Sequence, residues 1–275
     1  MPKTSHPLRL IRSLIFLCIV VSTTAVDHAA AATLYDRSLA LLNRHAAQAD
    51  PENFSFVVMG DSRTNESLFR KVLRRAATYH PLFILHGGDI GEGGSLVELN
   101  RFLRIVSQEA NDIPVFVVRG NHEQDLRLFR ELIGPQQFTI DLPRLNTITA
   151  AVDNSDYELT SSSLAYLKKA LTQPRRHHFV MMHIPPRTTS WNWHTFADGA
   201  SELFSMLVIN RPEIAFFSHV HQFACDDSRG YPMVITGGAG AQLYPKGKFP
   251  GYPLHHFVLV RIEQGEMSAE VVKIK

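Results

Sequence analysis

Three apolar runs in the first half of the chain each end in a glycine followed by a residue with a carboxylate or amide side chain. They are FVVMGD, ILHGGD and FVVRGN, which end at Asp61, Asp89 and Asn121. The second of these residues follows the first by 28 positions and the third follows by another 32, and each distance suits one strand–helix–strand unit. Apolar residues at helical spacing predict helices over residues 67–79 and 96–106 between the runs. Strands that alternate with helices predict an α/β fold with parallel strands.

The polar residues at these strand ends are expected to meet, because ligands of open α/β sheets bind beyond the carboxyl ends of the strands. Two runs in the second half, HHFVMMH and AFFSHVH, end in histidines as well. His219 and His221 are two positions apart, so on a strand both would face the same side and serve one cluster. All these residues are of metal-ligand types; they are Asp61, Asp89, Asn121, His183, His219 and His221.

Each of these residues, taken alone, has an ordinary structural explanation. An aspartate after a glycine at a strand end is commonly a turn residue or a helix cap, and a lone histidine on a strand is more often structural than a ligand. Five strand ends that supply two carboxylates, an amide and three imidazoles are hard to explain as turns. The set therefore predicts a metal centre at the sheet edge.

The remainder of the chain continues the α/β pattern, with more strand in the second half. The segments predicted as helices are 34–49, 160–171 and 200–207, and those predicted as strands include a bent pair over 138–155 and the final runs 233–242 and 256–275. The sequence contains no internal repeat and no long linker. The simplest prediction is a single domain over residues 33–275.

Residues 1–32 have a different character. Lys3, Arg9 and Arg12 precede the apolar run LIFLCIVV, which leads to DHAAAA, and this is the order of a secretory signal peptide. The apolar run is shorter than the roughly 20 residues that cross a bilayer, so no stable membrane span is expected in the mature chain. An uncleaved signal anchor is the alternative. We expect a periplasmic or secreted protein.

Loss of this leader would change the charge and the cysteine count. The full chain has a net charge of +2, and without residues 1–32 it would be neutral, so electrostatics does not favour nucleic acid as a partner. Cys18 would leave with the leader and Cys225 would remain alone, which excludes an internal disulfide in the mature fold. Its stability is then expected to come from packing or from bound metal.

Five blocks that contain the candidate ligands occur in a family order. The blocks GDSR, GGDIGE, GNHE, MMHIPP and SHVH, within residues 54–222, resemble the ordered blocks of the calcineurin-like metallophosphoesterases. The resemblance, to an exported bacterial member, implies a four-layer αββα sandwich of two mixed β-sheets flanked by helices. It also implies a dinuclear metal centre.

The resemblance distributes the candidate ligands between two ions. It implies that one ion is bound by Asp61, Asp89 and His221. It implies that the other is bound by Asp89, Asn121, His183 and His219, with Asp89 bridging the two. His122 is implied as the catalytic histidine near the leaving group, and it is not a ligand.

Phosphate-ester hydrolysis suits such a centre on chemical grounds. Two cations about 3.5–4 Å apart neutralise phosphoryl oxygens and lower the pKa of a bridging water, whose hydroxide attacks phosphorus in line. Imidazole suits Fe, Mn or Zn. His122 can protonate the leaving oxygen, and the amide of Asn121 can polarise a phosphate oxygen. We expect a hydrolase of small phosphate esters that uses two divalent or trivalent metal ions.

The first block departs from the family pattern. Many members have Asp-x-His there, whereas this chain has Arg63, which cannot ligate a metal as imidazole does. One hypothesis is that the Arg63 guanidinium binds a substrate phosphate oxygen, and the other is an ordinary ion pair. Glu92 stands where the purple acid phosphatase branch has a tyrosine, and its carboxylate is a candidate to complete the first ion's ligands.

Two other functions remain open from the sequence. The changed residue at position 63 is the one feature that favours a non-catalytic metal-binding or phosphate-binding protein with the same fold, whereas the retained His122 and ligands favour an enzyme. A phosphoesterase that acts on lipid or cell-wall material is the third. In the loop over residues 187–199, Trp191, Trp193 and His194 either form the wall of a substrate pocket or pack the loop onto the core.

Overall fold

Two mixed β-sheets form the centre of the structure, a computed structural model that describes Met1 and Ala32–Lys275. The expected leader lies almost entirely outside the described residues. Residues 32–275 form one compact unit. The first sheet has the order β11-β10-β1-β2-β3 and consists of β1 (Asn53–Met59), β2 (Ile84–His86), β3 (Val115–Val117), β10 (His256–Glu263) and β11 (Glu266–Lys273). β1, β2 and β3 are parallel, as predicted, whereas β10 is antiparallel to both β1 and β11.

The second sheet has the order β4-β5-β6-β7-β9-β8. Its strands are β4 (Phe138–Leu142), β5 (Thr147–Ala151), β6 (His177–Met181), β7 (Ile214–Phe217), β8 (Phe223–Asp226) and β9 (Met233–Thr236). The four strands β5, β6, β7 and β9 are parallel, and the edge strands β4 and β8 are antiparallel to their neighbours. β4 and β5, joined by the 3₁₀ turn η1 (Pro143–Leu145), form the predicted bent pair.

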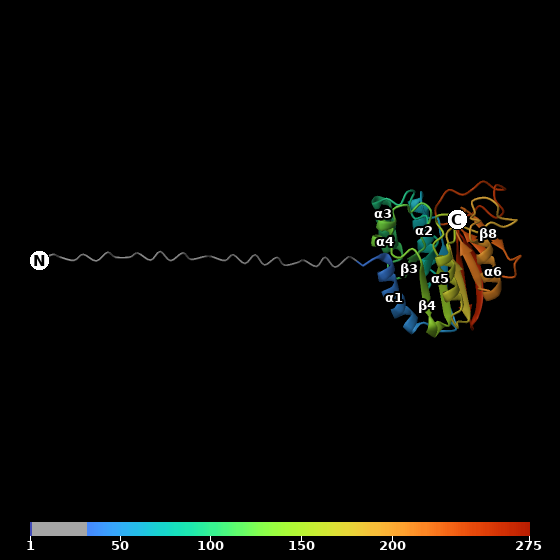
Figure 1. Ribbon diagram of the computed structural model, residues 1–275, viewed down its shortest axis with the longest axis horizontal. Helices are drawn as coiled ribbons and strands as arrows, with labels where there is room; N and C mark the ends of the chain where they lie inside the picture. Colours follow the sequence, from blue (N-terminus) through green and yellow to red (C-terminus); the bar gives the residue numbers. More distant parts are fainter. Residues whose placement is uncertain (2–31) are drawn as a thin grey trace. The chain divides into compact units, whose positions relative to one another are not determined.

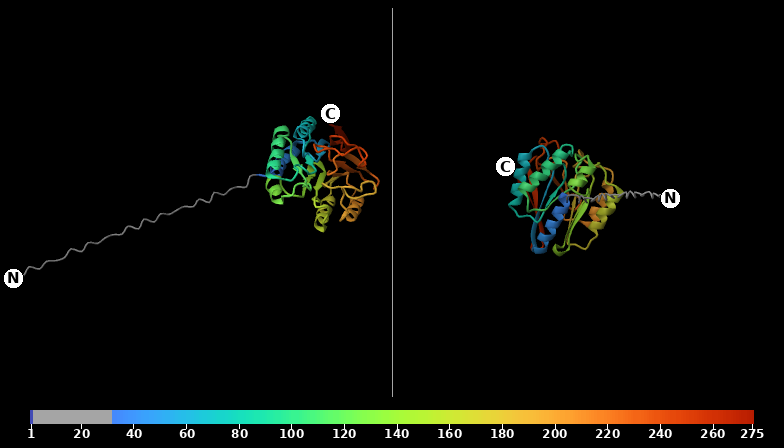
Figure 2. Two further views of the ribbon diagram at one scale, coloured as in Figure 1. Left: turned by 90° about the horizontal axis from the view of Figure 1, so that it is seen from above. Right: turned by 90° about the vertical axis from the view of Figure 1, so that its left-hand side faces the viewer.

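Helices cover the outer faces of both sheets. They are α1 (Leu34–Gln48), α2 (Glu66–Ala77), α3 (Leu96–Glu109), α4 (Leu126–Leu132), α5 (Ser161–Leu171) and α6 (Ala200–Asn210). In Figure 1 and in the right-hand view of Figure 2, α2, α3 and α4 lie on one side, α5 and α6 lie on the other, and the strands lie between them. This confirms the predicted four-layer α/β sandwich. α1 packs beside β3 at the edge of the sandwich.

Alternating side chains of the strands supply two different cores. In β1, Phe56 and Val58 point toward the other sheet, whereas Val57 and Met59 point toward the helices, as expected of a strand with a two-residue period. Between the sheets, Phe56 stacks on Phe83 with ring centroids 4.7 Å apart and meets the edge of Phe179 at 4.9 Å. This aromatic packing joins the layers.

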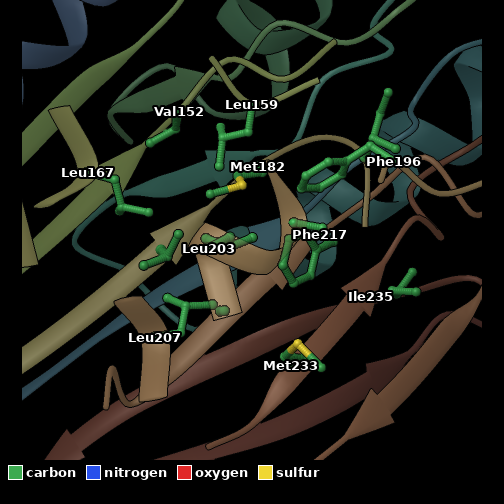
Figure 3. Close-up of a cluster of buried hydrophobic side chains, with 14 of the residues drawn as sticks. Val152, Leu159, Leu167, Met182, Phe196, Leu203, Leu207, Phe217, Met233 and Ile235 are labelled. Carbon is green, nitrogen blue, oxygen red and sulfur yellow. The ribbon is translucent and has the colours of Figure 1, made fainter. Parts of the chain in front are cut away.

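The outer core of the second sheet lies under α5 and α6. Figure 3 shows Leu203 and Leu207 of α6 in the same cluster as Met182, which follows β6, and Phe217, which ends β7. All four side chains are fully buried. Burial of each such side chain stabilises the fold by about 1.5–3 kcal/mol relative to exposure. This packing holds β6 and β7, the two strands that lead to His183 and His219.

The sequence prediction missed two elements, α4 and β8. α4 has only seven residues, although Asp125 caps it by accepting a hydrogen bond from the backbone N–H of Leu128 at 3.0 Å. β8 pairs with β9 at the edge of the second sheet. None of the helices in the described part of the chain has the length and apolar character needed to cross a bilayer.

Candidate metal centre

The structure brings all six candidate ligands together between the two sheets. Each follows the carboxyl end of a strand: β1, β2, β3, β6 and β7 lead in turn to Asp61, Asp89, Asn121, His183, and the pair His219 and His221. Two overlapping groups have ligand atoms that all lie within 4.8 Å of one another, and Asp89 belongs to both. The groups are Asp89, His183 and His219, called group A below, and Asp61, Asp89 and His221, called group B.

Group A converges on one nitrogen atom. His183 Nε2 lies 3.0 Å from Asn121 Oδ1, 3.2 Å from Asp89 Oδ1 and 3.2 Å from His219 Nδ1. His183 Nδ1 lies 2.6 Å from the carbonyl oxygen of Gly87, which can only accept, so Nδ1 holds the proton and Nε2 carries a lone pair. The lone pairs of His183 Nε2, Asp89 Oδ1 and Asn121 Oδ1 repel one another at these distances unless a cation lies among them. The donor set of group A therefore fits a metal ion.

Group B has buried carboxylate oxygens without donors. Among the described residues, Asp61 Oδ1 and Asp89 Oδ2 have no hydrogen-bond partner. His221 Nδ1 donates to the carbonyl oxygen of Gln242 at 2.8 Å, which leaves the lone pair of its Nε2 facing Asp61 Oδ1 at 3.6 Å. Because a buried oxygen without a hydrogen-bond partner destabilises the fold, a positive charge near these atoms would be stabilising.

The guanidinium of Arg63 lies against group B. Its Nε is 3.4 Å from Asp89 Oδ2, its Nη2 is 3.3 Å from His221 Nε2, and its Nη1 is 2.7 Å from Glu92 Oε2. Glu92 is thus paired with Arg63 in the structure. The ion pair that the sequence left open is present, and binding of a substrate phosphate by Arg63 stays a prediction.

Burial shifts the pKa values of the candidate ligands. It raises the pKa of Asp61 well above its ordinary value, and the nearby Asp89 carboxylate raises it further. Burial lowers the pKa of His183, lowers that of His219 strongly, and lowers that of His221 to about 4. The three imidazoles are therefore neutral at neutral pH, which is the form that binds metal.

His122 lies beside the centre with its ring fixed. Its Nδ1 is 2.7 Å from the carbonyl oxygen of Glu92, so Nδ1 holds a proton and the neutral ring carries its lone pair on Nε2. Nε2 lies 3.8 Å from Asp89 Oδ2, and the side chain is 27% exposed. The ring therefore faces both the metal-ligand cluster and solvent.

Three of the candidate ligands have a left-handed backbone. The φ angles are 58° at Asp61, 57° at Asp89 and 64° at His219, a conformation that costs non-glycine residues about 1–2 kcal/mol. Such strain is characteristic of functional sites. The prediction that His219 and His221 lie on a strand is wrong, because β7 ends at Phe217 and the backbone turns at His219. That turn sends the two imidazoles to different groups of one cluster.

The comparisons with known proteins agree with this geometry. The family model of calcineurin-like phosphoesterases matches residues 54–223. The chain belongs to this family. Membership implies metal ions at the site and phosphoester chemistry. A search of curated proteins found no significant match.

Solved structures of the calcineurin-like phosphoesterase fold cover most of the chain. GAP50, described as the anchor in the inner membrane complex of Plasmodium, is 12% identical with a TM-score of 0.66, over 80% of this chain and 84% of its own. The purple acid phosphatase PPD1 of yellow lupin is 14% identical with a TM-score of 0.64, over 80% of this chain and 51% of its own. A dimetal phosphatase of Danio rerio is 15% identical with a TM-score of 0.61, over 81% of this chain and 96% of its own. At these identities the likeness shows the fold alone.

Glu123, which was not predicted from the sequence, stabilises the loops that carry two of the candidate ligands. Its buried carboxylate accepts hydrogen bonds from the backbone N–H groups of Asp89, Ile90, Gly91 and Gly120, at 2.8–3.3 Å. Burial and the Asp89 charge raise the pKa of Glu123 to about 8. It ties the loop after β2 to the loop after β3, and its place in the GNHE block was the only sequence signal for it.

Other residues hold the segments and rings around the candidate metal centre. The hydroxyl oxygen of Tyr157 lies 2.9 Å from His219 Nε2. Asn154 Oδ1 accepts the backbone N–H of His183 at 3.1 Å. His86 Nε2 lies 3.0 Å from the hydroxyl oxygen of Ser62, and burial lowers the pKa of His86 to about 3. The neutral ring thereby braces the segment between Asp61 and Arg63.

The loop over residues 187–199 contributes one tryptophan to the core and one to the site. Trp191 is buried and packs against Phe217. Trp193 lies against the ring of Tyr244, with centroids 5.2 Å apart, and the Tyr244 ring stacks on His221 at 5.0 Å. Tyr244, which the sequence analysis did not single out, links Trp193 to the candidate ligands. Lys248 Nζ lies 5.0 Å from the Trp193 ring centroid.

Proposed function

We propose that this chain hydrolyses small phosphate esters in a metal-dependent reaction. The observation that carries the proposal is group A, where the lone pair of His183 Nε2 meets the oxygens of Asp89 and Asn121 beside a ring nitrogen of His219. A bound metal ion supplies Lewis acidity to the phosphoryl oxygens and to the attacking water. The donor set suits Fe, Mn or Zn.

The chain's own contribution to bond cleavage is assigned to His122. The Glu92 carbonyl holds its Nδ1 proton, so the imidazolium form presents its second proton on Nε2, next to the cluster. A proton donated from Nε2 to the leaving oxygen would neutralise the charge that develops as the phosphorus–oxygen bond breaks. The exposed edge of the ring leaves room for a leaving group on the solvent side.

The first experiment measures phosphatase activity. Protein stripped by a chelator and reloaded with Mn²⁺, Zn²⁺ or Fe²⁺ is assayed on nitrophenyl phosphate as the monoester and on bis(nitrophenyl) phosphate as the diester. We expect turnover that a chelator abolishes, and a fall of about 1,000-fold in Asp89→Asn, because metal charge stabilises the transition state by several kcal/mol. Asp112→Asn, at an exposed aspartate, is the matched control. Turnover that survives both the chelator and Asp89→Asn would contradict the proposal.

The second experiment isolates His122 by leaving-group dependence. His122→Ala should slow hydrolysis of an alkyl phosphate by about 100- to 10,000-fold, the range for general acid catalysis. The loss on nitrophenyl phosphate should be much smaller, because nitrophenolate leaves without a proton. Equal losses on both substrates would show that His122 is not the proton donor.

A non-catalytic protein is the second candidate function. Arg63 within the ligand cluster favours it, because the position holds a cation where a ligand is expected. The structurally similar GAP50 is described as an anchor. In that case the protein would bind metal and inorganic phosphate, measured by calorimetry, without turnover of either ester with any of the three metals.

We further propose that residues 1–32 direct export and are removed, and that residues 33–275 act as one domain in the periplasm or outside the cell. The order of charge, apolar run and alanines in the leader supports this. The mass and the N-terminal residue of the protein from its native host would test it. A mature protein that begins at Met1 would contradict removal.

A further inference from the structure

The guanidinium of Arg63 occupies the side of the centre that a second metal ion would use. Its Nη1 donates to Glu92 Oε2 at 2.7 Å, its Nη2 lies 3.3 Å from His221 Nε2, and its Nε lies 3.4 Å from Asp89 Oδ2, an ion-pair contact without a hydrogen bond. Two of these partners, Asp89 and His221, are members of group B. The positive charge that group B requires is therefore present in the chain itself.

A metal ion in group B would compete with this guanidinium for the same atoms. Metal–oxygen and metal–nitrogen bonds are about 2.0–2.2 Å long, so the ion would need the lone pairs of Asp89 Oδ2 and His221 Nε2 that the arginine N–H groups face. Two positive charges this close together repel each other strongly, and a divalent ion doubles the repulsion. Group B does not fit a metal ion while Arg63 lies there.

Arg63 is held where it lies. Its side chain is only 15% exposed, its backbone N–H donates to the carbonyl oxygen of Asp89 at 3.2 Å, and Glu92 anchors the outer end of the guanidinium. The neighbouring Ser62 is braced by His86. A surface arginine has no such set of contacts.

We propose that the centre binds one metal ion, in group A, and that Arg63 serves as the fixed second cation in group B. A guanidinium has five N–H donors, and three are directed at Asp89, His221 and Glu92. The two that remain can bind a phosphoryl oxygen, which gives Arg63 the substrate role predicted from the sequence. This inference rests on the proposed metal-dependent function.

The test counts metal ions in the reloaded protein. Protein saturated with Mn²⁺ and freed of excess metal is analysed by elemental analysis and by electron paramagnetic resonance. We expect one Mn²⁺ per chain and the spectrum of an isolated ion. Arg63→His, which restores the Asp-x-His pattern, should bind two ions per chain and show the spectrum of an exchange-coupled pair. Arg63→Ala should also gain a second ion, with weaker affinity, because the positive charge is removed without adding a ligand.

Arg70→His is the matched control for the arginine substitution. Arg70 is similarly buried, 20% exposed, and is paired with Glu66 and Glu109 away from the cluster. It should leave the count at one ion per chain.

Two ions per chain in the unmodified protein, with a coupled spectrum, would overturn the inference. So would an anomalous scattering peak among Asp61, Asp89 and His221 in a crystal of the Mn²⁺ protein. Ester hydrolysis with two ions bound would refute the inference and leave the proposed function standing. One ion without hydrolysis of either ester would refute the proposed function and leave the single-ion count standing.

Discussion

Asn154 offers a sharp test of how the structure positions a candidate ligand. Its side chain is 2% exposed and makes three hydrogen bonds to the segment that carries His183. Oδ1 accepts the backbone N–H groups of His183 and Ile184, both at 3.1 Å, and Nδ2 donates to the carbonyl oxygen of Ile184 at 2.7 Å. One side chain thus satisfies three buried backbone groups at the point where β6 leads into the centre.

The substitution Asn154→Ala would leave two N–H groups and one carbonyl group buried without partners. An unsatisfied buried group costs about 1–3 kcal/mol. Water that enters the small cavity would satisfy part of this, so we expect a loss of about 3–5 kcal/mol in the free energy of unfolding. That is a large share of the free energy of unfolding of a typical protein, which is roughly 5–15 kcal/mol.

The measurement is urea denaturation of metal-free protein, with Asn65→Ala as the control. Asn65 caps α2 through one hydrogen bond to the N–H of Leu68, 3.0 Å long and exposed, and its loss should cost about 1 kcal/mol. Both variants should keep the wild-type dependence on urea concentration. Asn154→Ala should also weaken metal binding by about 10- to 100-fold, because His183 loses its support. A cost no larger than that of Asn65→Ala would refute the reasoning.

Two further predictions concern stability away from the metal. Phe83→Ala should lower the free energy of unfolding by about 3–5 kcal/mol in the same urea assay, because Phe83 is fully buried between the sheets against Phe56; a loss below about 1 kcal/mol would contradict the tight packing of that layer. Burial lowers the pKa of His256 to about 4, so this histidine is neutral in the folded protein. The free energy of unfolding should therefore fall by about 3 kcal/mol as the pH falls from 6.5 to about 4. His256→Asn, which can still donate to the Leu254 carbonyl, should reduce this pH dependence of the free energy of unfolding. His80→Asn, at an exposed histidine, should leave it unchanged. The same pH dependence in wild type and in His256→Asn would rule the assignment out.

The first half of the fold could be predicted because its information is local. Each strand of the β1–β3 unit is a continuous apolar run followed by a glycine, and each helix shows its own periodicity. The position of β10 beside β1 could not be predicted, because nothing near residue 256 indicates pairing with a strand some two hundred residues earlier. The α4 helix was missed because a seven-residue helix has too few turns to show a period.

The candidate ligands were predictable for a similar reason, and their supports were not. Each of the six follows a recognisable apolar run, so its place at the sheet edge follows from the strand before it. Glu123, Asn154 and Tyr157 act through contacts with residues 29 or more positions away. Only the folded arrangement shows those contacts. The orientation of His219 was mispredicted because a strand period says nothing of a left-handed turn after the strand.

The pairing of β1 with β10 ties Asp61 to the far end of the polypeptide. β10 pairs with β1 from Asn53 to Val58, and the N–H groups of Ala239 and Ala241 donate to the carbonyl oxygens of Gly60 and Asp61 at 3.0 and 2.8 Å. The stretch that matches the family stops at residue 223, so an expression fragment designed on it would contain every ligand and still lack the neighbour that holds β1 in place. The backbone around Asp61 therefore depends on the C-terminal hairpin as much as on the segments that carry the candidate ligands.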